Sequence, residues 1–108
     1  MIIVDTGAFV ALFDRRDSFN AAAQIAFSSV QETLITTYPV ITETCYFLGR
    51  RIGQSAQINF LRGIGMSTFE VFDLQSSHID RAIQLMESYA DLPMDFADAS
   101  LVVLYHLN

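Results

Sequence analysis

The chain begins with MIIVDTGAFVALF (residues 1–13), and the class of fold can be predicted from this stretch outward. Its first residues form a continuous aliphatic run that ends at Asp5, which predicts a short buried strand over 1–5. Thr6 can cap a helix, and the apolar run 8–13 predicts one or two helical turns directly after it. A strand that passes directly into a helix is typical of proteins in which strands and helices alternate.

The same alternation continues along the rest of the chain. Further strands are predicted at 33–36 and 69–73, and helices from Ser18 or Asn20 to 30, and at 39–51, 54–62, 77–89 and 95–107. Gly63 and Gly65 are expected to end the helix 54–62. Parallel strands joined through helices predict a three-layer α/β/α fold with a central parallel sheet. Because three strands make a thin core and no strand follows the final helix, we expect the sheet to lack its last strand or strands, or to be completed by another chain.

Length and composition predict a single domain. The 108 residues suffice for one core, and 52% of them are apolar, which excludes a disordered chain. No run approaches the ~18 apolar residues of a membrane-spanning helix, and the N-terminus lacks the positive region of a signal peptide. The lone Cys45 excludes an internal disulfide and a cysteine-rich zinc site. We therefore expect a cytoplasmic protein with no membrane segment, organised as one domain over 1–108.

The charge balance restricts the partners. All six basic residues are arginine, twelve residues are acidic, and the formal net charge is −6. A protein that binds nucleic acid mainly by releasing counterions should be basic. Any nucleic-acid function therefore needs a local source of positive charge: a bound metal, a patch of arginines or a partner protein.

Four acidic residues fall near the carboxyl ends of the predicted strands, where open α/β sheets bind ligands. Asp5 directly follows the first strand, Glu43 lies about one turn into a helix, and Asp95 and Asp98 stand at the start of the last helix. Each alone has a structural explanation, as a helix cap, a complement to the helix dipole or an exposed residue on a solvated face. Together, like carboxylates repel one another unless a divalent cation joins them. Ligands that are all oxygen favour Mg²⁺ or Mn²⁺.

At three places the residues resemble the PIN-domain family, and within it the single-domain bacterial toxins of VapC type: IIVDTGA at 2–8, TET at 42–44 and DLPMDFADASLV at 91–102. These blocks span nearly the whole chain in the order of the family. The resemblance implies an α/β/α fold with a parallel sheet. It also implies a metal-dependent endoribonuclease that hydrolyses RNA phosphodiester bonds, acting as the toxin of a toxin–antitoxin pair.

The resemblance further implies roles for particular residues. Asp5, Glu43 and Asp98 would be the catalytic residues and the ligands of Mg²⁺ or Mn²⁺, with Asp95 as an additional metal ligand and the Thr6 hydroxyl in support. The metal would activate a water molecule for attack on the phosphorus. The family also carries a fourth acid on a later strand, and this sequence stops before that position, so we expect the PIN-like domain to be C-terminally incomplete.

The partners implied are an RNA substrate and a small antitoxin protein, and we also expect a homodimer. Four arginines are candidates for contacts to RNA phosphates, with solvated surface residues as the alternative for each: Arg15, Arg16, Arg50 and Arg51.

Two other classes of function remain open. A phosphotransfer domain with an aspartate nucleophile at the strand end is disfavoured because the chain has no lysine. A catalytically inactive, truncated PIN fragment that acts only by protein association is the main alternative. Six phenylalanines are interpreted as core or dimer surface rather than as platforms for base stacking, because basic residues do not alternate with them: Phe9, Phe13, Phe27, Phe47, Phe60 and Phe72.

Overall fold

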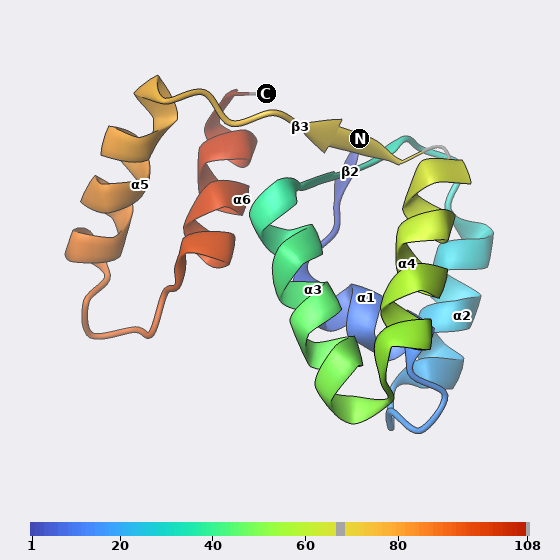
Figure 1. Cartoon of the computed structure of the whole chain (residues 1–108). Helices are drawn as coiled ribbons and strands as arrows, with labels where there is room; N and C mark the ends of the chain where they lie inside the picture. The colour runs from blue at the N-terminus through green and yellow to red at the C-terminus, as the bar shows by residue number, and fades with distance from the viewer. Residues whose placement is uncertain (67–68, 108) are drawn as a thin grey trace.

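The structure, a computed structural model, describes residues 1–66 and 69–107 (Figure 1). Its strands form one parallel sheet in the order β1-β2-β3, where β1 is Ile2–Ile3, β2 is Leu34–Thr37 and β3 is Glu70–Phe72. The helices are α1 (Thr6–Phe13), α2 (Asn20–Ser29), α3 (Tyr38–Arg51), α4 (Gln54–Met66), α5 (Ser77–Ser88) and α6 (Phe96–Leu107). Asn108, the last residue of the expected domain, lies outside the described residues. The predicted α/β fold with a parallel sheet and flanking helices is confirmed.

The middle strand, β2, holds the sheet together. Ile3 of β1 pairs with Ile35 of β2, and Ile35 in turn pairs with Glu70 of β3. Ile35–Thr37 are buried, as is usual for a strand covered on both faces. The buried Thr36 hydroxyl donates a hydrogen bond of 2.8 Å to the carbonyl oxygen of Val4. Because β2 leads directly into α3, the first turns of α3 lie at the carboxyl edge of the sheet.

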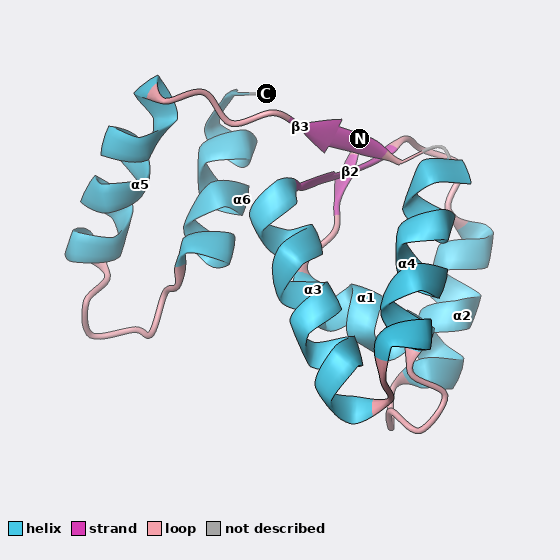
Figure 2. Ribbon diagram, viewed as in Figure 1, coloured by secondary structure: helices cyan, strands magenta, loops and turns pink. Residues whose placement is uncertain are grey.

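Figure 2 shows α5 and α6 side by side, set apart from the group formed by α1–α4. α6 bridges the two groups, since it contacts α5 as well as α3 and β2. A buried hydrogen bond of 2.7 Å between the hydroxyls of Thr37 and Ser100 links the end of β2 to α6. This bond helps to hold the start of α6 near the sheet edge. None of the described helices is long and apolar enough to cross a membrane.

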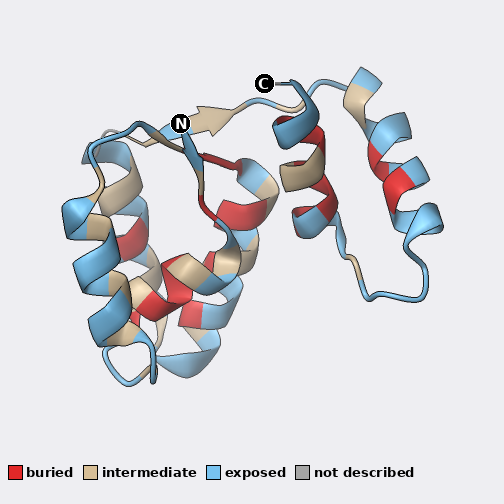
Figure 3. Ribbon diagram, turned by 180° about the vertical axis from the view of Figure 1, so that it is seen from behind, coloured by how far each residue is buried: buried red, intermediate tan, exposed pale blue. Residues whose placement is uncertain are grey.

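The buried residues gather in two clusters (Figure 3). The larger cluster centres on Phe9 and Phe60, both fully buried, whose rings meet edge to face at 5.2 Å. The smaller cluster joins α5 to α6 through Ala82, Leu85 and Val103, with other small apolar residues. The packing of α5 against α6 thus has a core of its own, which supports the helix that carries Asp98.

The structure corrects one sequence prediction about the helices and narrows another. The expected helix end at Gly63 and Gly65 is wrong, because α4 continues to Met66. A Cβ at position 63 would lie 3.2 Å from the ring of Phe13, so this glycine permits close packing rather than ending a helix. Phe47, interpreted as core or dimer surface, is 39% exposed and so lies outside the core, whereas Thr44 is fully buried on the same helix and donates a hydrogen bond to the carbonyl oxygen of Val40.

Candidate active site

Asp5 and Thr6 form the junction between β1 and α1. Asp5 is the N-cap of α1: its Oδ1 accepts a hydrogen bond of 2.9 Å from the backbone N–H of Ala8. Thr6 Oγ1 is buried and makes no hydrogen bond of regular geometry among the described residues. A buried hydroxyl without a partner is uncommon, so its position calls for a ligand or a bound water.

Asp95 and Asp98 cap the N-terminus of α6 together, because each side chain accepts a hydrogen bond from the backbone N–H of the other. Asp95 Oδ1 accepts a bond of 2.8 Å from the backbone N–H of Asp98, and Asp98 Oδ2 accepts a bond of 3.3 Å from the N–H of Asp95. This reciprocal pattern is that of a capping box, with aspartate in the place usually taken by glutamate or glutamine. The structural explanation therefore accounts for Asp95 well, and it holds the Asp98 carboxylate in a fixed place at the helix start.

Glu43, on α3, lies close to the two aspartates at the start of α6. Its pKa is raised, partly because of their negative charges. A hydrogen bond shared with Asp95, followed by burial, raises the pKa of Glu43, and the charges of Asp95 and Asp98 add to the effect. The nearby Thr6 hydroxyl acts in the opposite direction and lowers it. The same hydrogen bond from Glu43 lowers the pKa of Asp95. The two carboxyls therefore titrate as a coupled pair, with Glu43 the more easily protonated of the two.

The Asp98 carboxyl is perturbed mainly by its surroundings. Burial raises the pKa of Asp98, and the negative charges of Asp95 and Asp5 raise it further, while hydrogen bonding from the backbone of Asp95 opposes the shift. Groups with pKa values shifted by burial and by like charges often mark functional sites. Four acids from three separated segments thus lie within electrostatic reach of one another.

Three of these acids, Asp5, Glu43 and Asp98, line one pocket of about 770 Å³, which we call the acidic pocket. Thr6 also lines it. Asp95 does not line this pocket; together with Glu43 it lines a neighbouring groove. Among the residues that the structure describes, no group of three or more His, Cys, Asp or Glu side chains is placed so that it could hold a metal ion. The expected ligands thus share one pocket without forming a preformed coordination shell.

The residues of the acidic pocket nevertheless fit a divalent cation. Its donors are carboxylate and hydroxyl oxygens, the ligands that Mg²⁺ and Mn²⁺ prefer. Mg²⁺ usually keeps several of its waters and takes one or two carboxylates from a protein, so three converging carboxylates need not all contact it. The raised pKa values of Glu43 and Asp98 mark a place where positive charge would be stabilising.

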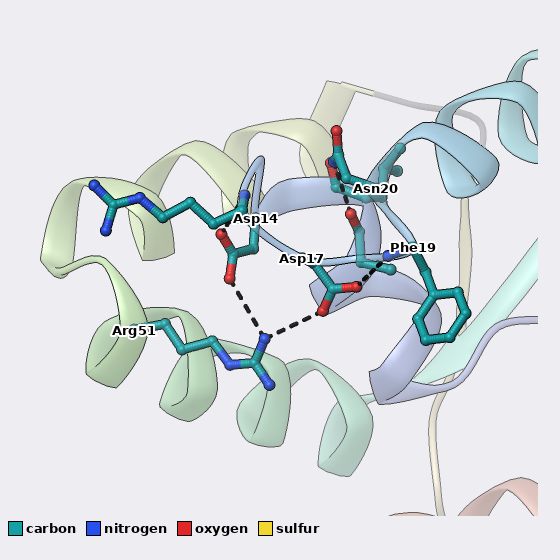
Figure 4. A network of polar contacts seen from close by, with 8 residues as sticks. Asp14, Asp17, Phe19, Asn20 and Arg51 are labelled. Carbon is teal, nitrogen blue, oxygen red and sulfur yellow. Dashed lines mark hydrogen bonds and ion pairs between the residues drawn. The ribbon is translucent and has the colours of Figure 1, made fainter.

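Arg51 is the one candidate arginine that lines the acidic pocket in the part of the chain described here. Figure 4 shows its guanidinium, from α3, directed toward two acids of the loop between α1 and α2. Arg51 Nη1 lies 3.4 Å from Asp14 Oδ2 and 3.2 Å from Asp17 Oδ2. Asp17 also lines the pocket, and Asp14 is almost fully buried. The pair of acids fixes the direction of this cation at the mouth of the pocket.

The other arginines lie elsewhere. Arg15 and Arg16 line a separate groove between the α1–α2 loop and α4. Arg50 donates a hydrogen bond of 3.1 Å to the Tyr46 hydroxyl and lies 5.7 Å from the centre of that ring. Of the four arginines expected to contact RNA phosphates, Arg51 therefore lines the acidic pocket and the other three do not.

Sequence reasoning missed the residues that support Arg51. Asp14 and Asp17 follow the first helix in a polar stretch, and nothing local to them indicates a partner 37 or 34 residues away. Asn20 was considered only as a helix start, yet its side-chain amide donates bonds of 2.8 and 3.1 Å to the carbonyls of Ala11 and Leu12. Asn20 thereby closes the C-terminal end of α1, whose N-terminus carries Thr6.

Comparison with known proteins identifies similar chains. A family model described as "PIN domain" matches residues 2–107. The chain is 29% identical over 103 residues to "Ribonuclease VapC26" of Mycobacterium tuberculosis (strain ATCC 25618 / H37Rv), covering 95% of this chain and 76% of that protein. Its fold is similar to the crystal structure of Mycobacterium tuberculosis VapC20, described as a "Sarcin-Ricin loop cleaving toxin". The TM-score is 0.91 with 21% sequence identity, and the match covers 98% of this chain and 82% of the other.

Proposed function

Because the chain belongs to the PIN domain family, we propose that it is a metal-dependent endoribonuclease, the toxin of a toxin–antitoxin pair. The observation that carries the proposal is the convergence of Asp5, Glu43 and Asp98 on one pocket from three distant parts of the chain. The curated relative at 29% identity is itself named a ribonuclease. The proposed site is therefore the acidic pocket, and the proposed substrate is RNA.

Asp5, Glu43 and Asp98 are the proposed ligands of Mg²⁺ or Mn²⁺, and Thr6 supports them with its hydroxyl. When bound, such an ion supplies a water of lowered pKa and neutralises charge on the phosphate. Asp95, which the resemblance implies as an additional metal ligand, is proposed here as a supporting residue, because its carboxylate caps α6 and bonds to Glu43 and does not line the pocket. Its role is to hold Glu43 and the start of α6 in place.

The protein residues have their own tasks around the phosphate. Arg51, which lines the acidic pocket and pairs with Asp14 and Asp17, is the proposed contact to a phosphate oxygen. A carboxylate of the pocket accepts the proton that the attacking water loses. The remaining arginines would contact RNA only further from the cleaved bond, since they lie outside the pocket.

The acidic net charge of −6 suits a basic partner. We propose that this partner is a small antitoxin protein that binds over the acidic pocket, and that the toxin acts in the cytoplasm as a homodimer. The chain is proposed to form a single domain over 1–108.

The experiment is cleavage of an end-labelled single-stranded RNA by the wild type and by Asp5→Asn, in Mg²⁺ or Mn²⁺ and in excess EDTA. We expect cleavage by the wild type with metal, loss of at least about a hundredfold with Asp5→Asn, and none with EDTA. Asp73→Asn is the matched control, because Asp73 is exposed and lines neither the acidic pocket nor the neighbouring groove. Cleavage indifferent to EDTA excludes the metal mechanism. No cleavage under any condition, with metal still bound, favours the alternative of an inactive fragment that acts by association.

A further inference from the structure

The acidic pocket offers an anionic ligand little positive charge of its own. Among the described residues that line it, four are acidic and Arg51 is the only basic one. A phosphate that enters the pocket therefore depends on this guanidinium and on any cation that the acids bind. The way in which the guanidinium is held then decides which of its N–H groups remain for a ligand.

Two acids hold Arg51 through a single nitrogen. Its Nη1 lies 3.4 Å from Asp14 Oδ2 and 3.2 Å from Asp17 Oδ2 (Figure 4). Its Nε and Nη2 make no hydrogen bond or ion pair with any residue that the structure describes. A guanidinium carries five N–H donors in a rigid plane, and two neighbouring nitrogens can bind a phosphate together. The Nε–Nη2 edge is therefore left for a ligand, while Nη1 is used within the protein.

The two acids are themselves fixed by the loop to which they belong. Asp14 Oδ1 accepts a hydrogen bond of 3.0 Å from the backbone N–H of Arg16, and Asp17 Oδ1 accepts one of 2.9 Å from that of Phe19. Each carboxylate thus uses one oxygen for the loop and the other for Arg51. The side chains of Asp14 and Asp17 are only 7% and 16% exposed, so neither pair is a fully solvated surface ion pair, which usually contributes little.

Holding the guanidinium in advance lowers the cost of binding a ligand. The Arg51 side chain is 48% exposed, so it keeps contact with solvent while it lines the pocket. A freely moving arginine loses much rotamer entropy when a ligand orders it. Arg51 is already ordered by two acids, so most of that loss occurs on folding rather than on binding. The acids therefore favour a contact to phosphate, although their own charge opposes it.

We propose that Asp14 and Asp17 are positioning residues, which hold Arg51 by Nη1 so that its Nε–Nη2 edge binds two oxygens of an RNA phosphate at the acidic pocket. This inference rests on the proposed function for its substrate class. Neither acid contacts the substrate, and both act through Arg51. The inference gives two acidic residues a part in RNA binding, although each adds negative charge beside a polyanion.

The test is the binding of a fluorescein-labelled single-stranded RNA to the cleavage-deficient Asp5→Asn protein in Mn²⁺, followed by fluorescence anisotropy. Charge alone predicts that removing an acid near the RNA tightens binding, whereas positioning predicts weaker binding. We expect Asp17→Asn to raise Kd about fivefold, because the amide oxygen can still accept from Phe19 and only the charged contact to Arg51 is lost. Asp73→Asn, an exposed residue outside the pocket, removes the same charge and should leave Kd within about twofold.

Two further variants show whether Asp17 acts through Arg51. Asp17→Asn added to Arg51→Met should give no further rise in Kd, because the group that Asp17 positions is already gone. Arg51→Lys should keep the ion pair with Asp14 and the midpoint of urea denaturation. It should still raise Kd about fivefold, because an ammonium group has no planar second edge. A structural role alone would give the opposite result for the lysine variant, with stability and RNA binding both retained.

Cleavage by the wild type separates this inference from the proposed function. In the otherwise wild-type protein, Asp17→Asn should raise KM about fivefold and leave kcat within about twofold. Wild-type cleavage, with a Kd for Asp17→Asn no higher than that for Asp73→Asn, overturns the positioning role and leaves the ribonuclease intact. An effect of Asp17→Asn that persists beside Arg51→Met also overturns it, as does an absence of RNA binding by the Asp5→Asn protein. A rise in Kd that depends on Arg51, in a protein whose wild type cleaves no RNA, supports the positioning role and refutes the enzyme.

Discussion

Asp95 and Asp98 bind each other's backbone N–H groups at the start of α6, over 2.8 and 3.3 Å. The cap fixes Asp98 toward the acidic pocket while leaving Asp95 beside Glu43. Local helix capping and the clustering of acids are therefore parts of the same arrangement. The cap favours carboxylates here, and the same carboxylates repel their neighbours when no cation is present.

Glu43→Gln should stabilise the metal-free protein and abolish cleavage. The glutamine amide can donate a hydrogen bond to Asp95, and it carries no charge to repel Asp95 or Asp98. We expect a gain of roughly 0.5 kcal/mol in the free energy of unfolding in EDTA, measured by urea denaturation. Glu87→Gln, on the exposed face of α5, is the control that should change nothing. Destabilisation by Glu43→Gln in EDTA would contradict the view that the site is strained by its own charges.

Removal of metal should lower the melting temperature of the wild type. A ligand bound only by the folded state stabilises it by about 2.7 kcal/mol at a hundredfold excess over Kd. We expect Mn²⁺ or Mg²⁺ to raise the melting temperature by several degrees, and Asp5→Asn to lose most of that increase. Differential scanning fluorimetry with a metal titration measures both. Equal shifts in the wild type and Asp5→Asn would place the binding site elsewhere.

Arg51→Met should weaken both stability and RNA binding. It leaves the carboxylate of Asp14, whose side chain is only 7% exposed, without its cationic partner. We expect a loss of about 1 kcal/mol in urea denaturation, because Asp14 keeps its bond from the Arg16 backbone. KM for RNA should rise several-fold with little change in kcat. Arg62→Met, an exposed residue of α4, is the control; identical behaviour of the two variants would remove Arg51 from the site.

Asn20→Asp should destabilise the protein although the two side chains have nearly the same shape. The amide donates to two carbonyls at the end of α1, and a carboxylate would face those oxygens with negative charge. We expect a loss of about 1–2 kcal/mol in the free energy of unfolding near neutral pH. The same change at the exposed Asn59 should stay within about 0.5 kcal/mol. A loss at Asn20 no larger than at Asn59 would show that the amide does not secure the end of α1.

Two glycine substitutions should act in opposite directions. A Cβ at Gly49 would overlap the amide of Gln57 and disturb its 2.7 Å bond to the carbonyl of Cys45, so Gly49→Ala should cost about 1 kcal/mol. Gly65, in α4, has open space around its missing Cβ, and Gly65→Ala should gain about 0.5 kcal/mol. Thermal and urea denaturation compare the two. A gain at both positions would mean that α3 and α4 can separate without cost.

The order of strands and helices could be predicted because each element is specified locally. The aliphatic run before Asp5 and the proline at the start of α3 act within a few residues of themselves. The first strand was expected over 1–5, whereas β1 spans only Ile2–Ile3, since the element boundary depends on pairing with β2. Gly63 was misjudged for a similar reason: the ring of Phe13 that requires it comes from another helix.

In the candidate site, too, some residues could be identified from the sequence and others could not. The acids could be named from their positions relative to strands and helices, and their role as metal ligands remains a prediction. The setting of Arg51 could not be predicted, because its two acidic partners lie in a loop more than thirty residues earlier.

Glu43 lines both the acidic pocket and the neighbouring groove that it shares with Asp95. Any substitution at this position remodels both compartments at once, so the two cannot be redesigned independently. A charged ligand bound in either hollow would change the electrostatic potential in the other, because it would lie beside the same carboxyl group. For protein engineering, a change at Glu43 therefore has to be assessed in both hollows together.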